Sequence, residues 1–156
     1  MRLTYSPTTA DDAETLVLIR IAAMRESLER IGRFDPQRAR ARFLNTFDPA
    51  RCRLIEADGV TVGFIVVRPE KDHWLLDHLY ILPEHQRKGV GAAVLQDIFT
   101  DADIHNMPIR VGALRGSDSN HFYQRHGFVK IAEEEWDIYY LRPSNESPTG
   151  SDVVGP

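Results

Sequence analysis

The chain lacks the features of a secreted or membrane protein. Its 156 residues include a single cysteine, Cys52, so no disulfide can form within the chain. No apolar run approaches the roughly 20 residues of a membrane-spanning helix, and the first residues lack the hydrophobic segment of a signal peptide. We therefore expect a cytoplasmic protein that does not interact with membranes.

Positive charge and metal-binding patterns are scarce as well. The 19 Lys and Arg residues are outnumbered by 23 Asp and Glu residues, which gives a net charge of -4. An acidic chain has no general attraction for nucleic acid, so we expect no nucleic-acid partner. The six histidines show no H-x-x-x-H spacing and no neighbouring cysteine cluster, so no metal site is predicted either.

The composition is otherwise that of one folded domain. Hydrophobic residues make up 42% of the sequence, and seven Phe, five Tyr and two Trp can supply a buried core. Residues 143–151, by contrast, contain no large apolar side chain. We expect residues 1–142 to form a single domain and residues 143–156 to form a disordered tail.

Hydrophobic periodicity predicts a mixed α/β (α+β) fold. Apolar residues recur at helical spacing in four segments, which cover residues 13–28, 36–47, 91–102 and 120–126. Strand patterns occupy residues 2–5, 53–57, 60–67, 74–82, 109–114, 128–132 and 136–141. Asp58-Gly59 is a hairpin turn, so the strands between residues 53 and 82 can form an antiparallel meander. The strand at 109–114 follows a helix and must return parallel to the strand at 74–82.

Residues 79–92, with the sequence LYILPEHQRKGVGA, predict a strand, a loop and the start of a helix. Gly89 and Gly91 let the backbone approach an anion without interference from a Cβ atom. The N–H groups of the first helical turn carry the positive end of the helix dipole, and Arg87 and Lys88 add positive charge. This pattern is typical of a phosphate-binding turn.

Two common glycine loops do not fit this segment. A dinucleotide-binding G-x-G-x-x-G loop would need a third glycine where Val94 stands. A Walker loop needs Lys followed by Ser or Thr after its second glycine, whereas Lys88 precedes both glycines. Neither a dinucleotide site nor a nucleotide-hydrolysis site is therefore predicted.

The turn resembles the signature of the GNAT superfamily of N-acetyltransferases, Q/R-x-x-G-x-G/A after a strand, which reads Gln86-Arg87-Lys88-Gly89-Val90-Gly91 here. A second element of that family, F-Y-x-x-x-G-F, is matched by FYQRHGF at residues 122–128. The order of helices and strands from residue 2 to residue 142 is also similar. The resemblance implies a GNAT-like domain, with a central mixed and mostly antiparallel sheet, flanking helices and a splayed strand pair at the cofactor site.

The resemblance implies acetyl-CoA as the cosubstrate. We expect contacts from the strand before the turn, from the turn itself and from the loop after residue 114. The residues concerned are Leu79, Tyr80, Ile81, Gln86, Arg87, Lys88, Gly89, Val90, Gly91, Ala92, Ser117 and Asn120. The family usually builds its acceptor pocket in the first two helices, and most charged residues there, such as Arg20 and Arg25, are expected to face solvent.

The resemblance also implies catalytic roles. An alkyl amine with a pKa of about 10.4 must lose a proton before it attacks a thioester. The candidate bases are Asp77, which is slightly preferred, His78 and an ordered water; Asp77 and His78 are adjacent on a strand and should point to opposite faces. A main-chain N–H of Leu79 or Ile81 would bind the oxyanion, and Tyr123 would protonate the departing CoA thiolate.

The leading hypothesis is therefore an acetyl-CoA-dependent N-acyltransferase that acetylates a primary amine of a small molecule or a protein by direct attack. The alternative is a domain of the same fold that binds acyl-CoA as a sensor or interaction module without catalysis, although the presence of Tyr123 argues against it. The resemblance is also compatible with a homodimer, although no segment of the sequence determines the oligomeric state. The acceptor is not identified, because specificity comes from loops and helices whose geometry one sequence does not determine.

Overall fold

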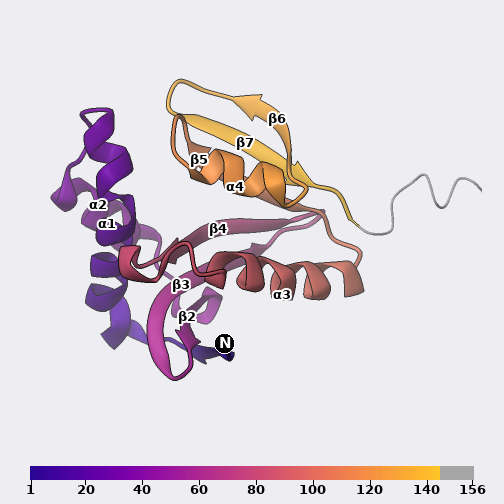
Figure 1. Cartoon of the computed structure of the whole chain (residues 1–156), viewed down its shortest axis with the longest axis horizontal. Coiled ribbons are helices and arrows are strands. Elements are labelled where there is room, and N and C mark those ends of the chain that lie inside the picture. Colours follow the sequence, from indigo (N-terminus) through magenta and orange to yellow (C-terminus); the bar gives the residue numbers. More distant parts are fainter. Residues whose placement is uncertain (145–156) are drawn as a thin grey trace, which may run out of the picture. The chain divides into compact units, whose positions relative to one another are not determined.

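The computed structural model describes residues 1–144. It has one α+β fold with a seven-stranded mixed sheet in the order β1-β2-β3-β4-β5-β7-β6. The strands are β1 (Leu3–Pro7), β2 (Cys52–Ala57), β3 (Val60–Pro69), β4 (Trp74–Ile81), β5 (Ile109–Leu114), β6 (Val129–Glu133) and β7 (Asp137–Arg142). The helices are α1 (Ala13–Arg30), α2 (Pro36–Thr46), α3 (Val90–Ile104) and α4 (Ser119–Arg125) (Figure 1). The predicted fold class is confirmed, and most of the expected tail, residues 145–156, lies outside the described residues.

Contacts within the chain divide it into two compact units. One consists of Met1–Val67 with His78–Ala93, and the other of Arg68–Asp77 with the residues from Val94 onward. The boundary passes through β3, β4 and α3, so each unit contains strands from the sheet together with helices.

In the first unit, α1 and α2 share an apolar core with β2 and β3. Its buried members are Leu16, Val17, Ile19, Phe43, Cys52, Phe64 and Val66. The start of α2 is stabilised by Asp35, whose side chain accepts a hydrogen bond from the N–H of Arg38, and by Pro36 in the first turn. Thr9 caps a 3-10 turn at Ala10–Asp12 that leads into α1.

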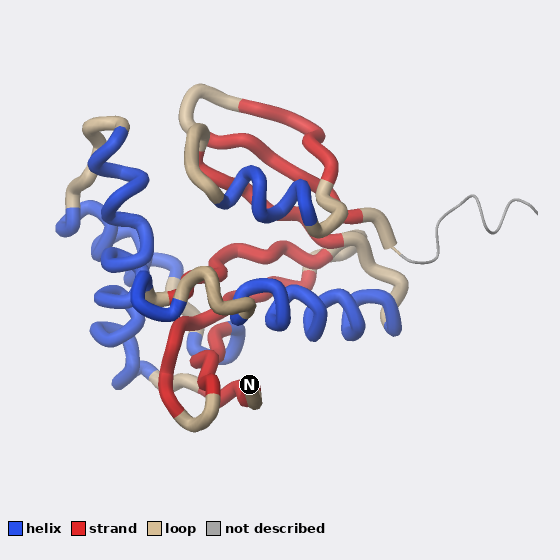
Figure 2. Tube along the Cα trace, in the orientation of Figure 1, coloured by secondary structure: helices blue, strands red, loops and turns tan. Residues whose placement is uncertain are grey.

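In the second unit, β5 pairs antiparallel with β7, and β7 pairs antiparallel with β6. α4 packs against β5 in this group (Figure 2). Arg142 at the end of β7 makes two hydrogen bonds of 2.8 and 3.1 Å to Asp103, and its guanidinium lies 4.0 Å from the ring centre of Phe99. These contacts connect the last strand with α3.

β4 pairs with a different neighbour at each of its ends. At the start, Trp74 donates its N–H to the carbonyl of Pro108, and the first residues of β4 run parallel to β5. At the end, the N–H of Leu82 donates to the carbonyl of Val62 in β3. Residues an even number of positions apart in a regular strand donate to the same side, so the alternation is interrupted, or slips, between Trp74 and Leu82.

Gly63 of β3 faces the end of β4. A Cβ atom on Gly63 would lie 3.0 Å from the carbonyl carbon of Tyr80, closer still to its oxygen, and 3.1 Å from the Cα atom of Ile81. The Tyr80 carbonyl thus fills the space of a side chain on Gly63. Glycine is required there for close approach of the backbone.

We predict that Gly63→Ala lowers the free energy of unfolding by about 1–3 kcal/mol, because the new methyl group meets a backbone carbonyl that has little freedom to move. Gly112→Ala is the matched control, since a Cβ atom there would meet ring carbons of Tyr139 at 3.1 and 3.2 Å, and a ring can shift. Urea denaturation of both variants measures the difference. Equal stability of the two variants would contradict the proposed contact.

Candidate active site

The connection from β4 to α3 is an exposed turn with unusual backbone angles. Arg87 has φ 62° and Gly89 has φ 86°, both in the left-handed region. Gln86, Arg87, Lys88 and Gly89 are exposed. The Gln86 side chain reaches back to donate a hydrogen bond of 2.8 Å to the carbonyl of Ile81, which ties the turn to the end of β4.

The first turn of α3 supplies main-chain N–H groups whose hydrogen bonds no carbonyl of the same helix can accept. The carbonyl of Gly89 accepts the hydrogen bond from the N–H of Ala93, so the helical bonding begins at Gly89. N–H groups of the first helical turn have no partner within their own helix. The turn therefore combines main-chain donors, the positive end of a helix dipole and the cations of Arg87 and Lys88, which is an arrangement that suits a diphosphate.

Asp77 and His78 have different surroundings. Asp77 lies in the second unit, where its Oδ2 accepts a hydrogen bond of 2.7 Å from Nε of Arg68 on β3. His78 lies in the first unit, where its ring is 5.6 Å from the ring of Phe43 and 6.2 Å from that of Phe64. Both residues are partly exposed.

Tyr80 connects β4 to α1. Its hydroxyl lies 3.2 Å from Nδ1 of His78 and accepts a hydrogen bond of 3.4 Å from Nε of Arg20. Arg20 also donates from Nη1 to the carbonyl of Ala39 on α2, at 3.0 Å. The expectation that charges on the first helix face solvent therefore does not hold for Arg20, which is partly buried and hydrogen-bonded to β4 and α2.

The segment at residues 122–128 closes α4 with a Schellman motif. The N–H of Phe128 donates to the carbonyl of Tyr123, and the N–H of Gly127 donates to the carbonyl of Gln124. Gly127 has φ 92°, which is why a glycine stands there. The accompanying apolar contact joins Phe128 to Tyr123, whose ring centres are 5.3 Å apart.

Tyr123 is held in place by this helix end. Only 6% of its surface is exposed, and its ring also lies 5.3 Å from the ring of Phe122. The spacing of the aromatic pair and the glycine thus follows from the geometry of the motif. A phenol fixed in this way has little freedom to change its orientation.

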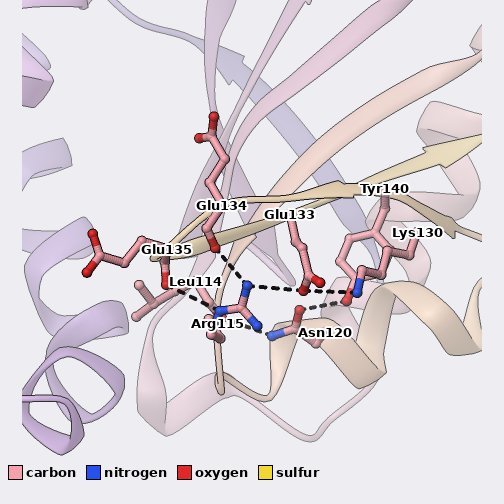
Figure 3. Close-up of polar contacts among 8 residues, drawn as sticks. All are labelled: Leu114, Arg115, Asn120, Lys130, Glu133, Glu134, Glu135 and Tyr140. Atoms are coloured by element: carbon pink, nitrogen blue, oxygen red, sulfur yellow. Dashed lines mark hydrogen bonds and ion pairs between the residues drawn. The ribbon is translucent and has the colours of Figure 1, made fainter.

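Asn120 closes the loop between β5 and α4. Its Nδ2 donates to the carbonyls of Leu114 and Ser117, both at 2.9 Å, and its Oδ1 accepts a hydrogen bond of 2.6 Å from the hydroxyl of Tyr140 (Figure 3). Burial raises the pKa of the Tyr140 phenol, so this hydroxyl remains a donor at neutral pH. Asn120, expected at the cofactor, is therefore also a structural residue of this loop.

Arg115, which the sequence analysis did not single out, organises the β6–β7 loop. Its guanidinium donates to the carbonyls of Glu134 and Glu135, at 2.7 and 3.2 Å, and pairs with Glu133 at 3.1 Å (Figure 3). Hydrogen bonds from Lys130 and Arg115 hold the pKa of Glu133 below its usual range. No sequence pattern marks these contacts, because they join residues far apart in the chain.

Within residues 1–144, no three His, Cys, Asp or Glu side chains gather as metal ligands. In the same range, no helix combines the length and apolar character needed to cross a membrane.

Known proteins resemble the chain in sequence and fold. A model of the acetyltransferase (GNAT) domain matches residues 48–130, more than half of the chain. No curated protein sequence matches. Among solved structures, the PaiA N-acetyltransferase from Thermoplasma acidophilum in complex with coenzyme A has a TM-score of 0.69 at 17% identity, with 92% of this chain and 99% of that chain covered.

Two further structures have the same fold. The acetyltransferase from Thermus thermophilus has a TM-score of 0.70 at 20% identity and covers 92% of this chain and 97% of its own. The ribosomal-protein alanine N-acetyltransferase from Escherichia coli has a TM-score of 0.70 at 15% identity, with coverages of 94% and 97%.

We predict that Asn120→Ala lowers the free energy of unfolding by about 1–3 kcal/mol, because it removes hydrogen bonds to two carbonyls and leaves the buried Tyr140 hydroxyl without its acceptor. Tyr140→Phe removes only the donor side of one bond and should cost less. Urea denaturation of both variants checks the order. Wild-type stability of Asn120→Ala would contradict the structural role.

Proposed function

Because the chain belongs to the GNAT acetyltransferase family, we propose that it transfers an acetyl group from acetyl-CoA to a primary amine of a small molecule or a protein. The observation that carries this proposal is the exposed turn into α3, where two residues have positive φ and two basic side chains precede a helix start, an arrangement that suits a diphosphate. A relative of the same fold was crystallised with coenzyme A, which supports the choice of cofactor.

The cofactor contacts are proposed on three segments. The diphosphate binds the turn, formed by Gln86, Arg87, Lys88, Gly89, Val90, Gly91 and Ala92. The pantetheine arm and thioester follow the main chain of Leu79, Tyr80 and Ile81. Ser117 and Asn120 are second-rank contacts to the cofactor amides, with Asn120 using acceptor capacity on Oδ1 that Tyr140 does not occupy.

The slip in β4 supports the thioester position. The N–H of Leu82 donates to β3, and successive N–H groups of a strand point to alternate sides. With this alternation continued from Leu82 towards the start of β4, the N–H groups of Ile81 and Leu79 point away from β3. The carbonyl of Ile81 likewise faces the Gln86 side chain rather than β3. An N–H group of this kind can donate to a thioester carbonyl and to the oxyanion that forms from it.

The proposed reaction is a direct transfer. The neutral amine attacks the thioester carbonyl, and the carbonyl oxygen takes the negative charge while bound to a β4 N–H group. Collapse of this intermediate breaks the carbon–sulfur bond. Tyr123 gives its phenolic proton to the CoA thiolate, and a base takes the proton that the amine loses.

The base is proposed to be Asp77, with His78 or an ordered water as the alternatives. Asp77 is a partly exposed carboxylate on β4, but its Oδ2 is hydrogen-bonded to Arg68. For Asp77 to act as the base, its carboxylate must bind the ammonium group of the acceptor while it remains hydrogen-bonded to Arg68. His78 presents its Nδ1 to Tyr80 instead.

We predict that Tyr123→Phe lowers kcat by roughly 100-fold, as expected for loss of a general acid. The Kd for acetyl-CoA should stay within about twofold of the wild-type value, because the ring that packs on Phe128 is retained. Release of free thiol measures turnover, and calorimetry measures binding. Tyr139→Phe, which removes another phenol from the same unit, is the control. Unchanged turnover of Tyr123→Phe would remove the proposed role, and tight CoA binding without turnover by the wild type would favour the sensor alternative.

We predict that Asp77→Asn lowers kcat and removes from its pH profile the acidic limb that reports protonation of the base in the enzyme–substrate complex. Arg68→Gln is the matched control, since it breaks the same ion pair but keeps the carboxylate. Its acidic limb should remain. An unaltered profile for Asp77→Asn would exclude Asp77 and leave His78 or water as the base.

A further inference from the structure

Arg20 differs from the other arginines of the first two helices. The other five, Arg25, Arg30, Arg38, Arg40 and Arg42, are all exposed. Three of them pair with carboxylates: Arg25 with Glu29, Arg30 with Glu26 and Arg40 with Glu14. Arg20 is partly buried, and its hydrogen bonds go to the Tyr80 hydroxyl and the Ala39 carbonyl, which are both neutral. Among residues 1–144, no carboxylate pairs with it.

A partly buried cation without a counter-ion is an unfavourable arrangement for folding alone. Loss of hydration costs free energy, and neutral acceptors compensate less well than a carboxylate does. The two hydrogen bonds of Arg20 use only part of the donor capacity of its guanidinium group, whose carbon also lies 6.0 Å from the ring centre of Tyr80. The side chain is therefore oriented and charged but incompletely bonded, as expected for a group that binds an anion from solution.

The position of Arg20 relates that anion to the proposed reaction. Nε of Arg20 lies 3.4 Å from the hydroxyl of Tyr80, so it is one side chain away from the main chain of β4. That main chain includes Leu79 and Ile81, the proposed donors to the thioester. Phe43 and Phe64 lie close to His78 and Tyr80, so the surroundings are largely apolar and strengthen a charged hydrogen bond.

We propose that the acceptor is a small amine that also carries a carboxylate, and that Arg20 binds this carboxylate and determines specificity. This inference rests on the proposed acetyl transfer at β4. The guanidinium fork matches a carboxylate, with Tyr80 and Ala39 fixing its orientation. The amine of such a substrate would then extend towards β4. A peptide N-terminus has no carboxylate close to its amine and is disfavoured.

The test compares amino-acid acceptors in matched pairs. One member of each pair carries the free carboxylate, and the other carries a carboxamide in its place. The probes are a series of α-amino acids and of longer ω-amino acids, with acetyl-CoA and detection of free thiol. In the wild type, kcat/KM for the best acid should exceed that for its carboxamide by roughly 10- to 100-fold, mainly through KM, as expected for one charged hydrogen-bonded pair.

Variants assign the preference to Arg20. Arg20→Gln should bring the ratio of acid to carboxamide close to one, and Arg20→Lys, which keeps the charge but not the fork, should give an intermediate ratio. Arg25→Gln is the matched control on the same helix and should keep the wild-type ratio. Calorimetry with acetyl-CoA verifies that each variant still binds the cofactor.

Three results would overturn the proposal for Arg20 without contradicting the proposed acetyl transfer. They are equal use of acid and carboxamide by the wild type, an unchanged ratio in Arg20→Gln, and acetylation of neither series by a protein that binds acetyl-CoA. Failure of the wild type to bind acetyl-CoA would instead overturn the proposed function, and the acceptor proposal with it.

Discussion

The close approach of the Tyr80 carbonyl to Gly63 is the constraint on which the site depends. It brings the end of β4 against β3 without an intervening side chain, and the N–H of Leu82 then bonds to Val62. The slip in β4 follows, because its first residues are paired with β5. The same slip sets the direction of the main chain at Leu79 and Ile81 and leads into the turn that Gln86 ties to Ile81. A larger residue at position 63 would disturb all of these contacts.

The aromatic-glycine element at the end of α4 has a structural origin that is separate from catalysis. Gly127 adopts a positive φ that terminates the helix, and Phe128 packs on Tyr123. The motif would fix the ring of Tyr123 whether or not its hydroxyl carries a proton to a thiolate. The sequence match alone therefore supports the fold more firmly than it supports the proposed acid role.

Much of the fold was predictable because local patterns decide it. Apolar periodicity located the helices and strands, and Asp58-Gly59 predicted a hairpin whose two turn residues do have positive φ values. The glycine turn was also recognisable, since its residue types reflect local backbone needs. The slip in β4 was not recognisable from the sequence. Residues 74–82 have the pattern of one regular strand, and the close approach that accompanies the slip involves Gly63 in β3. Arg20 was expected to face solvent and Arg115 was not singled out, for a similar reason: charged residues reveal their partners only after distant segments meet.

The central claim is that main-chain N–H groups near the end of β4 bind the acyl-CoA thioester. Amide hydrogen exchange, followed by NMR in the absence and presence of acetyl-CoA, tests it most directly. The account predicts that the amides of Leu79 and Ile81 exchange rapidly in the free protein, then shift and become protected as acetyl-CoA saturates it, while the amide of Leu82 is protected throughout. Protection of Leu79 and Ile81 in the free protein, or the absence of any saturable shift on addition of acetyl-CoA, would contradict the account.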